Sequence, residues 1–326
     1  MRTPYNTPLD QMLADWWNGI DQTYKKAFFF VVGINLLAFG FEMTNLTLHH
    51  DDLFQIFIQD DILGHYLGRF GVGKLHYITQ NAYFMPFLQM LQGIVFMSIY
   101  GVLVARFWGA RNTLDLTLVA SIVCVFPYMA QVLQYNTSMA TYPLAHLLAA
   151  VAVILSTRGT FIHAATASLL YLSAFSISQS VIANAATIFV LWVLFNLLFG
   201  NEGKTITVRT MLGSTVWAVV SVAVGGILYI VAVSFMDVDF DSSQAADEAF
   251  KLNKDIDLAY AFSEIVHGTR SFFMWPENYF PDYLKKFQLV LIAGSGIFCL
   301  LVPKSLGGKI AAIGLLALTA FTPRVL

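Results

Sequence analysis

Charge and cysteine are both scarce in this sequence. Only 12% of the 326 residues are charged, whereas 57% are hydrophobic and 15% are aromatic. A water-soluble globular domain usually carries about 25% charged residues, which excludes an ordinary cytoplasmic enzyme and a disordered protein. The net charge of −2 lacks the basic excess of proteins that bind nucleic acid. Cys124 and Cys299, the two cysteines, lie in apolar runs and indicate neither a disulfide framework nor a cysteine metal site.

Long apolar runs recur along the chain instead. A membrane-spanning helix needs about 20 mostly apolar residues, and the runs predict an all-α polytopic membrane protein with about nine transmembrane helices. The fourth and fifth runs are short and the last is marginal. The predicted spans are 27–46, 84–105, 114–132, 140–156, 161–178, 182–200, 210–235, 287–303 and 310–323.

The polar N-terminal segment, residues 1–26, differs from the rest of the chain. Three aspartates surround Trp16 and Trp17, and the segment ends in two lysines. This pattern is typical of a cytoplasmic amphipathic helix that lies at the membrane interface, with its tryptophans at headgroup level. We expect residues 27–326 to form a single membrane-embedded domain.

The distribution of charge predicts the orientation. With a cytoplasmic N-terminus, the inside segments hold ten basic and five acidic residues, and the outside segments hold eight basic and fourteen acidic ones. Every inside loop is short and carries Lys or Arg, as the positive-inside rule requires. The N-terminus is therefore predicted to be cytoplasmic.

Two outside loops, residues 47–83 and 236–286, are long enough to carry function. Within them, segments 53–67 and 245–266 show apolar residues at helical spacing. We expect both segments to be amphipathic helices on the outer leaflet, enclosing a cavity over the bundle. The inside loops are too short to build an active site.

The first outside loop concentrates acidic residues. It contains the pairs Asp51-Asp52 and Asp60-Asp61, followed by Arg69. Adjacent carboxylates repel each other, which favours proton uptake by one of the two. A carboxylate of this kind is suited to act as the general base that takes a proton from a hydroxyl group. The planar fork of Arg69 suits phosphate oxygens. The alternative interpretation is a solvated run of surface charge.

A divalent metal site is a second alternative for this loop. His49, His50 and the four aspartates are all possible ligands. However, the ligands are consecutive, and no spacing places two of them on one helical face. The sequence therefore predicts no metal and no other cofactor.

Four further residues are possible substrate-binding groups. Glu42 lies about a turn from the outer end of the first span, where an acid is either functional or reaches the interface. Gln179 lies at a helix break, where it can bind a sugar or satisfy backbone groups. Arg270 and Trp275 lie in the second loop, where an aromatic residue can stack on a sugar or join an interfacial belt.

Short motifs give the sequence a family resemblance. Asp51-Asp52 directly follow the first span, and Gly68-Arg69 follow with Arg69 seventeen positions after Asp52. Gln179 and Pro323-Arg324 supply two further matches, although the tyrosine expected beside the glutamine is missing. In these motifs and in span order the chain resembles the bacteriophage-type serotype-converting O-antigen glucosyltransferases (GtrII-like), which have a GT-C fold.

The resemblance implies an activity. Such enzymes transfer glucose from undecaprenyl phosphate glucose to a sugar of lipid-linked O-antigen, at the periplasmic face of the bacterial inner membrane, with inversion. Asp51 or Asp52 would be the base, and Arg69 would hold the leaving phosphate. Arg324 would be a second phosphate ligand. The extra Asp60-Asp61 pair and the missing tyrosine leave open which carboxylate is the base.

Two other functions share this composition. A transporter or flippase of a lipid-linked sugar or small solute would place its important polar residues deep in the membrane. Apart from Glu42, the predicted spans hold no acidic or basic residue deep in the membrane, and the acids gather outside, which favours surface chemistry. A non-catalytic scaffold would tolerate loss of every loop carboxylate.

Overall fold

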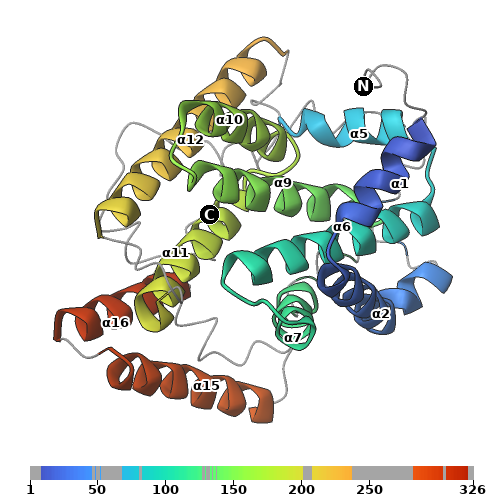
Figure 1. Cartoon of the computed structure of the whole chain (residues 1–326). Helices are drawn as coiled ribbons and strands as arrows, with labels where there is room; N and C mark the ends of the chain where they lie inside the picture. Colours follow the sequence, from blue (N-terminus) through green and yellow to red (C-terminus); the bar gives the residue numbers. More distant parts are fainter. Residues whose placement is uncertain are drawn as a thin grey trace.

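The protein is all-helical in the part of the chain that its computed structural model describes (Figure 1). The predicted all-α class is therefore confirmed. The described residues are 9–45, 48, 52, 68–80, 83–126, 129, 133, 135–136, 138–200, 208–236, 282–303 and 306–321.

Eleven helices are described, and they follow the predicted runs closely. The first lies in the N-terminal segment that we expected to be amphipathic, and each of the nine predicted spans overlaps one helix. The helices are α1 (Leu9–Gly19), α2 (Gln22–Thr44), α5 (Phe70–Gln80), α6 (Pro86–Phe107), α7 (Thr113–Cys124), α9 (Thr141–Ser156), α10 (Phe161–Phe175), α11 (Val181–Phe199), α12 (Val208–Ser234), α15 (Asp282–Leu301) and α16 (Leu306–Phe321).

Four of these helices are long and apolar enough to cross a membrane by themselves. They are α2, α6, α11 and the Thr210–Ser234 part of α12. Five more apolar helices are shorter, and α7 has 12 residues where the sequence predicts a span over 114–132. The membrane character of the chain is thus supported, and the total of nine spans stays a prediction.

Within the first predicted outside loop, α5 is a helix that the sequence did not reveal. Its two glycines, Gly71 and Gly73, lower intrinsic helix propensity. The amphipathic helices expected over 53–67 and 245–266 lie outside the described residues.

Helix α9 lies at the centre of the bundle, in contact with α6, α10, α11 and α12. Small residues allow this close approach, because its buried face includes Ala145, Ala149 and Ala152. On α6, a Cβ at Gly93 would collide with the backbone carbonyl of Met139, just before α9. This close contact between the backbones at Gly93 and Met139 fixes the position of the N-terminus of α9 relative to α6.

Contacts along the helices define two ends of the bundle. At one end, Arg106 of α6 donates a hydrogen bond of 2.5 Å to the Tyr24 hydroxyl of α2. Farther along, the Asn35 amide donates to Ser98 at 3.0 Å, so α2 and α6 are antiparallel. We call the end with Tyr24 and Arg106 the basic end, because Lys25 and Lys26 also lie there. The opposite end is called the site end.

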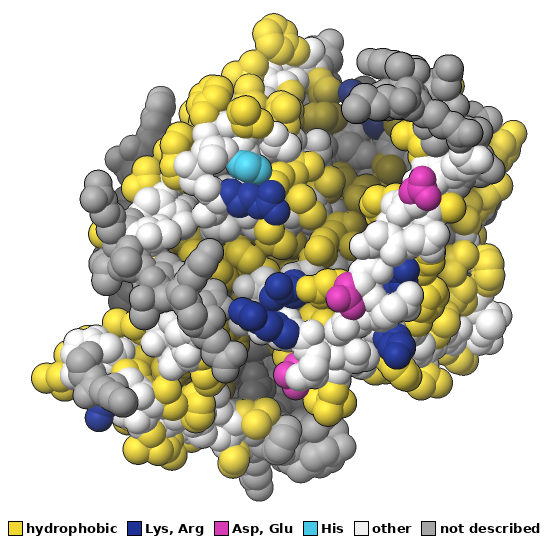
Figure 2. All heavy atoms as spheres, in the orientation of Figure 1, with side chains coloured by type: hydrophobic (Ala, Val, Ile, Leu, Met, Phe, Trp, Pro, Cys, Tyr) yellow, Lys and Arg dark blue, Asp and Glu magenta, His cyan; other side chains and the backbone are white. Residues whose placement is uncertain are grey.

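Apolar side chains cover much of the exterior, as expected for a surface in contact with lipid. Figure 2 shows large apolar areas on one face, with the few charged side chains gathered between them. Leu37 on α2 is 90% exposed, and many other large apolar side chains are exposed as well. Cys124 and Cys299 are both buried as free thiols.

The close approach at Gly93 leads to a stability prediction. We expect Gly93→Ala to lower the thermal unfolding midpoint markedly, because overpacking at this contact should reduce the free energy of unfolding by about 1–3 kcal/mol or more. The matched control is Gly40→Ala, where an added Cβ meets nothing within 4 Å. The control should be neutral or slightly stabilising, because alanine favours a helix over glycine by about 1 kcal/mol. Equal unfolding midpoints of the two variants in detergent would contradict this packing.

Candidate functional site

Four of the predicted site residues lie in the described part of the chain. They are Glu42, Asp52, Arg69 and Gln179. Glu42 lies in the last turn of α2 at the site end. The other candidates lie outside the described residues: Asp51, Asp60, Asp61, Arg270, Trp275 and Arg324.

Asp52 is fully buried, at 0% exposure. The side-chain amide of Asn136 donates a hydrogen bond of 2.8 Å to its Oδ2 atom. Asn136 is itself buried, five residues before α9 begins. Burial of a carboxylate is costly unless polar partners stabilise it. The hydrogen bond from the Asn136 amide group supplies such a partner and also fixes the plane of the carboxylate. Asp52 is therefore held in one orientation.

Arg69 is half-buried and is anchored by two helix ends. Its terminal nitrogen donates a 2.6 Å hydrogen bond to the Tyr142 hydroxyl in the first turn of α9. Its Nε faces Oε1 of Gln179 at 3.4 Å, between α10 and α11. The guanidinium carbon also lies 5.9 Å from the centre of the Tyr142 ring, a cation–π geometry. These contacts hold the guanidinium in place.

A second hydrogen-bond chain continues from Gln179 to α12. The Gln179 amide donates to the Tyr229 hydroxyl at 2.6 Å, and that hydroxyl donates to the Gly68 carbonyl at 3.3 Å. Gly68 has a φ of +63°, which favours glycine, and a Cβ there would come within 2.8 Å of the Tyr229 hydroxyl. The backbone that carries Arg69 is thus shaped by Tyr229.

The start of α5 completes this clamp. The Gly71 amide donates a 2.8 Å hydrogen bond to the Ser176 carbonyl at the end of α10. The Phe70 ring stacks on the Tyr229 ring with their centres 6.3 Å apart. Arg69 therefore lies between two residues that are both fixed to the helix bundle.

All of these groups lie at the site end. Asp52 follows α2, Tyr142 lies in the first turn of α9, and Gln179 lies between α10 and α11. Gly93, near the start of α6, approaches Met139, and the Tyr100 ring farther along meets His146 with their centres 6.0 Å apart. Helices α6 and α9 therefore run parallel. Both begin at the end opposite the Tyr24–Arg106 contact.

The arrangement pairs a fixed carboxylate with a fixed cation. Asn136 and Tyr142 belong to one short segment, so Asp52 and Arg69 are both tied to the start of α9. Among the described residues Arg69 makes no ion pair, and its remaining N–H groups make no hydrogen bond. A half-buried guanidinium in this state is suited to bind an anion such as a phosphate.

A metal cluster is not found in the described residues. No group of three or more His, Cys, Asp or Glu side chains there is arranged to hold an ion. The histidines and three of the four aspartates that the sequence offered as ligands lie outside the described part. The absence of a metal from the site therefore stays a prediction.

Three members of the site were not identified from the sequence: Asn136, Tyr142 and Tyr229. Each is a polar residue near the end of an apolar helix, which is a weak signal that many interfacial residues share. The Tyr229 hydroxyl accepts a hydrogen bond from the Gln179 amide. The resemblance pointed to a tyrosine adjacent in sequence, whereas the structure supplies one from another helix.

The Tyr229 hydroxyl provides a test of this clamp. Replacing it in Tyr229→Phe removes two hydrogen bonds, and we expect the free energy of unfolding to fall by about 1–3 kcal/mol. Tyr171→Phe is the matched control, because Tyr171 is buried and its hydroxyl makes no hydrogen bond to the described residues. Thermal unfolding of both variants in detergent should show a lower midpoint for Tyr229→Phe alone. An equal shift in both variants would contradict the clamp.

Comparison with known proteins adds one result. The family model described as glucosyl transferase GtrII matches residues 40–326, which include every member of the site. Neither a curated protein nor a solved structure matches the chain.

Proposed function

Because the chain belongs to the glucosyl transferase GtrII family, we propose that it transfers glucose from undecaprenyl phosphate glucose to a sugar of lipid-linked O-antigen. We place the reaction at the periplasmic face of the bacterial inner membrane. The observation that carries this proposal is the half-buried Arg69, which has no ion pair in the described residues and lies at the same end of the bundle as buried Asp52.

Arg69 is assigned to the phosphate of the donor. In transfer from a lipid phosphate sugar, the bond between C1 and the phosphate oxygen breaks and the phosphate leaves with its negative charge. A fixed cation stabilises that charge as it develops, and it needs no reorganisation during the reaction. The bonds from Arg69 to Tyr142 and Gln179 supply this fixation and leave other N–H groups of the guanidinium for the phosphate. Arg324 is proposed as a second phosphate ligand.

Asp52 is assigned to the acceptor. As general base it takes the proton of the acceptor hydroxyl while the hydroxyl oxygen attacks C1 from the face opposite the phosphate. The Asn136 amide fixes the carboxylate that must meet this hydroxyl. Attack from the opposite face inverts the anomeric centre. Asp51 remains the alternative base.

The remaining predicted residues are proposed to contact the sugars. Gln179 lies against Arg69, so its amide is close to the proposed phosphate position. Glu42 ends α2, which precedes Asp52 in the chain. The others are assigned by the sequence alone: Asp60, Asp61, Arg270 and Trp275.

The proposed base gives the first activity test. We expect Asp52→Asn to lower the transfer rate by about 100-fold or more, the usual contribution of a general base. The isosteric amide removes the proton acceptor and keeps the shape. Asp115→Asn, at the start of α7, is the control and should retain the wild-type rate. Glucose transfer is measured on purified enzyme in proteoliposomes with both lipid-linked substrates. Equal rates for Asp52→Asn and wild type would exclude Asp52 as the base.

Arg69 gives a test of the phosphate assignment. We expect Arg69→Ala to abolish measurable transfer and Arg69→Lys to recover only part of it, because lysine keeps the charge and loses the fork that meets Tyr142, Gln179 and the phosphate. For Arg69→Lys, the dependence of the transfer rate on substrate concentration should show weaker binding of the donor and unchanged binding of the acceptor. A larger effect on the acceptor would contradict the assignment.

The proposal also predicts independence from metal ions. Arg69 supplies the positive charge that a divalent ion supplies in other transferases, so a chelator should leave the transfer rate unchanged. Loss of activity in chelator, restored by a divalent ion, would show that the loop carboxylates hold a metal instead.

A further inference from the structure

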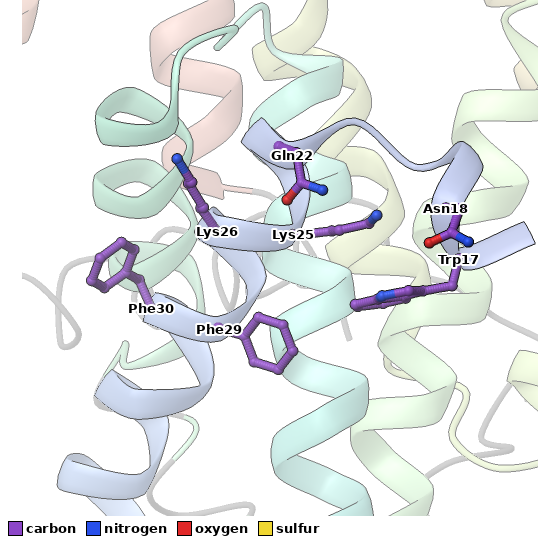
Figure 3. A pocket seen from close by; sticks show the side chains of 7 residues that line it. All are labelled: Trp17, Asn18, Gln22, Lys25, Lys26, Phe29 and Phe30. Atoms are coloured by element: carbon purple, nitrogen blue, oxygen red, sulfur yellow. The ribbon is translucent and has the colours of Figure 1, made fainter. Parts of the chain in front are cut away.

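An open pocket of about 600 Å³ lies at the basic end of the bundle, far from Arg69 (Figure 3). Trp17 from α1 lines it on one side. The first turns of α2 supply Gln22, Lys25, Lys26, Phe29 and Phe30. Gln22 lies between the two lysines on this helix face, with Lys25 directed towards Trp17 and Lys26 towards the other side. The pocket therefore has two cations at its top and aromatic rings below.

Lys25 is unusual because it is only 7% exposed. Its Nζ lies 5.0 Å from the centre of the Trp17 ring, and it makes no hydrogen bond or ion pair with the described residues. Asp21 interacts with it only through space. That carboxylate accepts a 2.7 Å hydrogen bond from the Thr23 amide, and its pKa is lowered mainly by Thr23 and least by Lys25. A buried ammonium group thus lines the pocket without a hydrogen-bonded anion.

The face of α2 below the pocket is apolar and has gaps. Phe29 and Phe30 are 58% and 60% exposed, and exposed leucines follow one to two turns on. Gly33 and Gly40 lie on the same face, and an added Cβ at either would meet nothing within 4 Å. The spacing of three, four and seven residues keeps these positions on one side of the helix. An extended acyl chain can lie along such a track.

We propose that this face of α1 and α2 binds one anionic phospholipid. Its phosphate lies between Lys25 and Lys26 over the Gln22 amide, and one acyl chain follows α2 past Gly33 and Gly40. The continuous apolar track favours a lipid over a soluble phosphate, because a free anion would use only the top of the pocket. The site is separate from Arg69 and does not depend on the proposed transfer reaction.

The test measures lipid binding by native mass spectrometry of the full chain in detergent. Phosphatidylglycerol is titrated into wild type, Lys25→Gln/Lys26→Gln, and Lys309→Gln as the matched control on α16. Wild type and control should bind one phosphatidylglycerol tightly. Loss of the two lysine charges near the headgroup in Lys25→Gln/Lys26→Gln should weaken phosphatidylglycerol binding by about 30-fold. Binding to the double-glutamine variant at wild-type strength would overturn the proposal.

Two further measurements identify the ligand and distinguish a loss of lipid binding from a loss of folding. Gly33→Leu changes no charge and fills the track at a position where an added Cβ meets nothing within 4 Å, so it should weaken phosphatidylglycerol binding and leave the unfolding midpoint unchanged. Glycerol 3-phosphate, a headgroup without acyl chains, should not compete at equal concentration. Equal binding by Gly33→Leu and wild type, or efficient competition by glycerol 3-phosphate, would show a free-anion site and contradict a lipid site.

Discussion

The fixed guanidinium of Arg69 is the feature around which the site end is organised. Its contacts with Tyr142 and Gln179 join the segment before α5 to the start of α9 and to the turn between α10 and α11. The Tyr229 hydroxyl extends the same network to α12 and back to the Gly68 carbonyl. Polar groups at this depth have little water available, so each must find a protein partner or a ligand. The network leaves the cation oriented and able to accept an anion.

The helix packing explains why these groups meet. Small residues on α9 and Gly93 on α6 let the helices approach to backbone contact. That contact fixes the position of the N-terminus of α9 along α6. It thereby also positions Asn136 and Tyr142, which hold Asp52 and Arg69. The proposed transfer needs a base and a phosphate-binding cation at one end of the bundle, and this packing brings Asp52 and Arg69, the residues proposed for these roles, to the same end.

Much of the fold could be predicted from the sequence, because apolar runs of helical length have few other structures in a membrane. The helices match the predicted runs in position, while α7 is shorter than its run and α5 was not expected. Asp52 and Arg69 were predicted from residue type and spacing, since charge in an apolar chain is rare, and Gln179 was predicted from its place at a helix break and from the family resemblance. Asn136, Tyr142 and Tyr229 could not be found in this way, because their roles depend on tertiary contacts between residues up to 161 positions apart.

The two ends of the bundle carry different cations. At the basic end Lys25 and Lys26 lie above an apolar helix face, whereas at the site end Tyr142 holds Arg69 and Asn136 holds the buried Asp52. We assign the phosphate of the sugar donor to Arg69 at the site end and not to the two lysines. A cryo-electron microscopy structure of the full chain with undecaprenyl phosphate added tests this assignment most directly. We expect the lipid phosphate within hydrogen-bond distance of the Arg69 guanidinium, and a phosphate bound only at Lys25 and Lys26 would contradict the assignment.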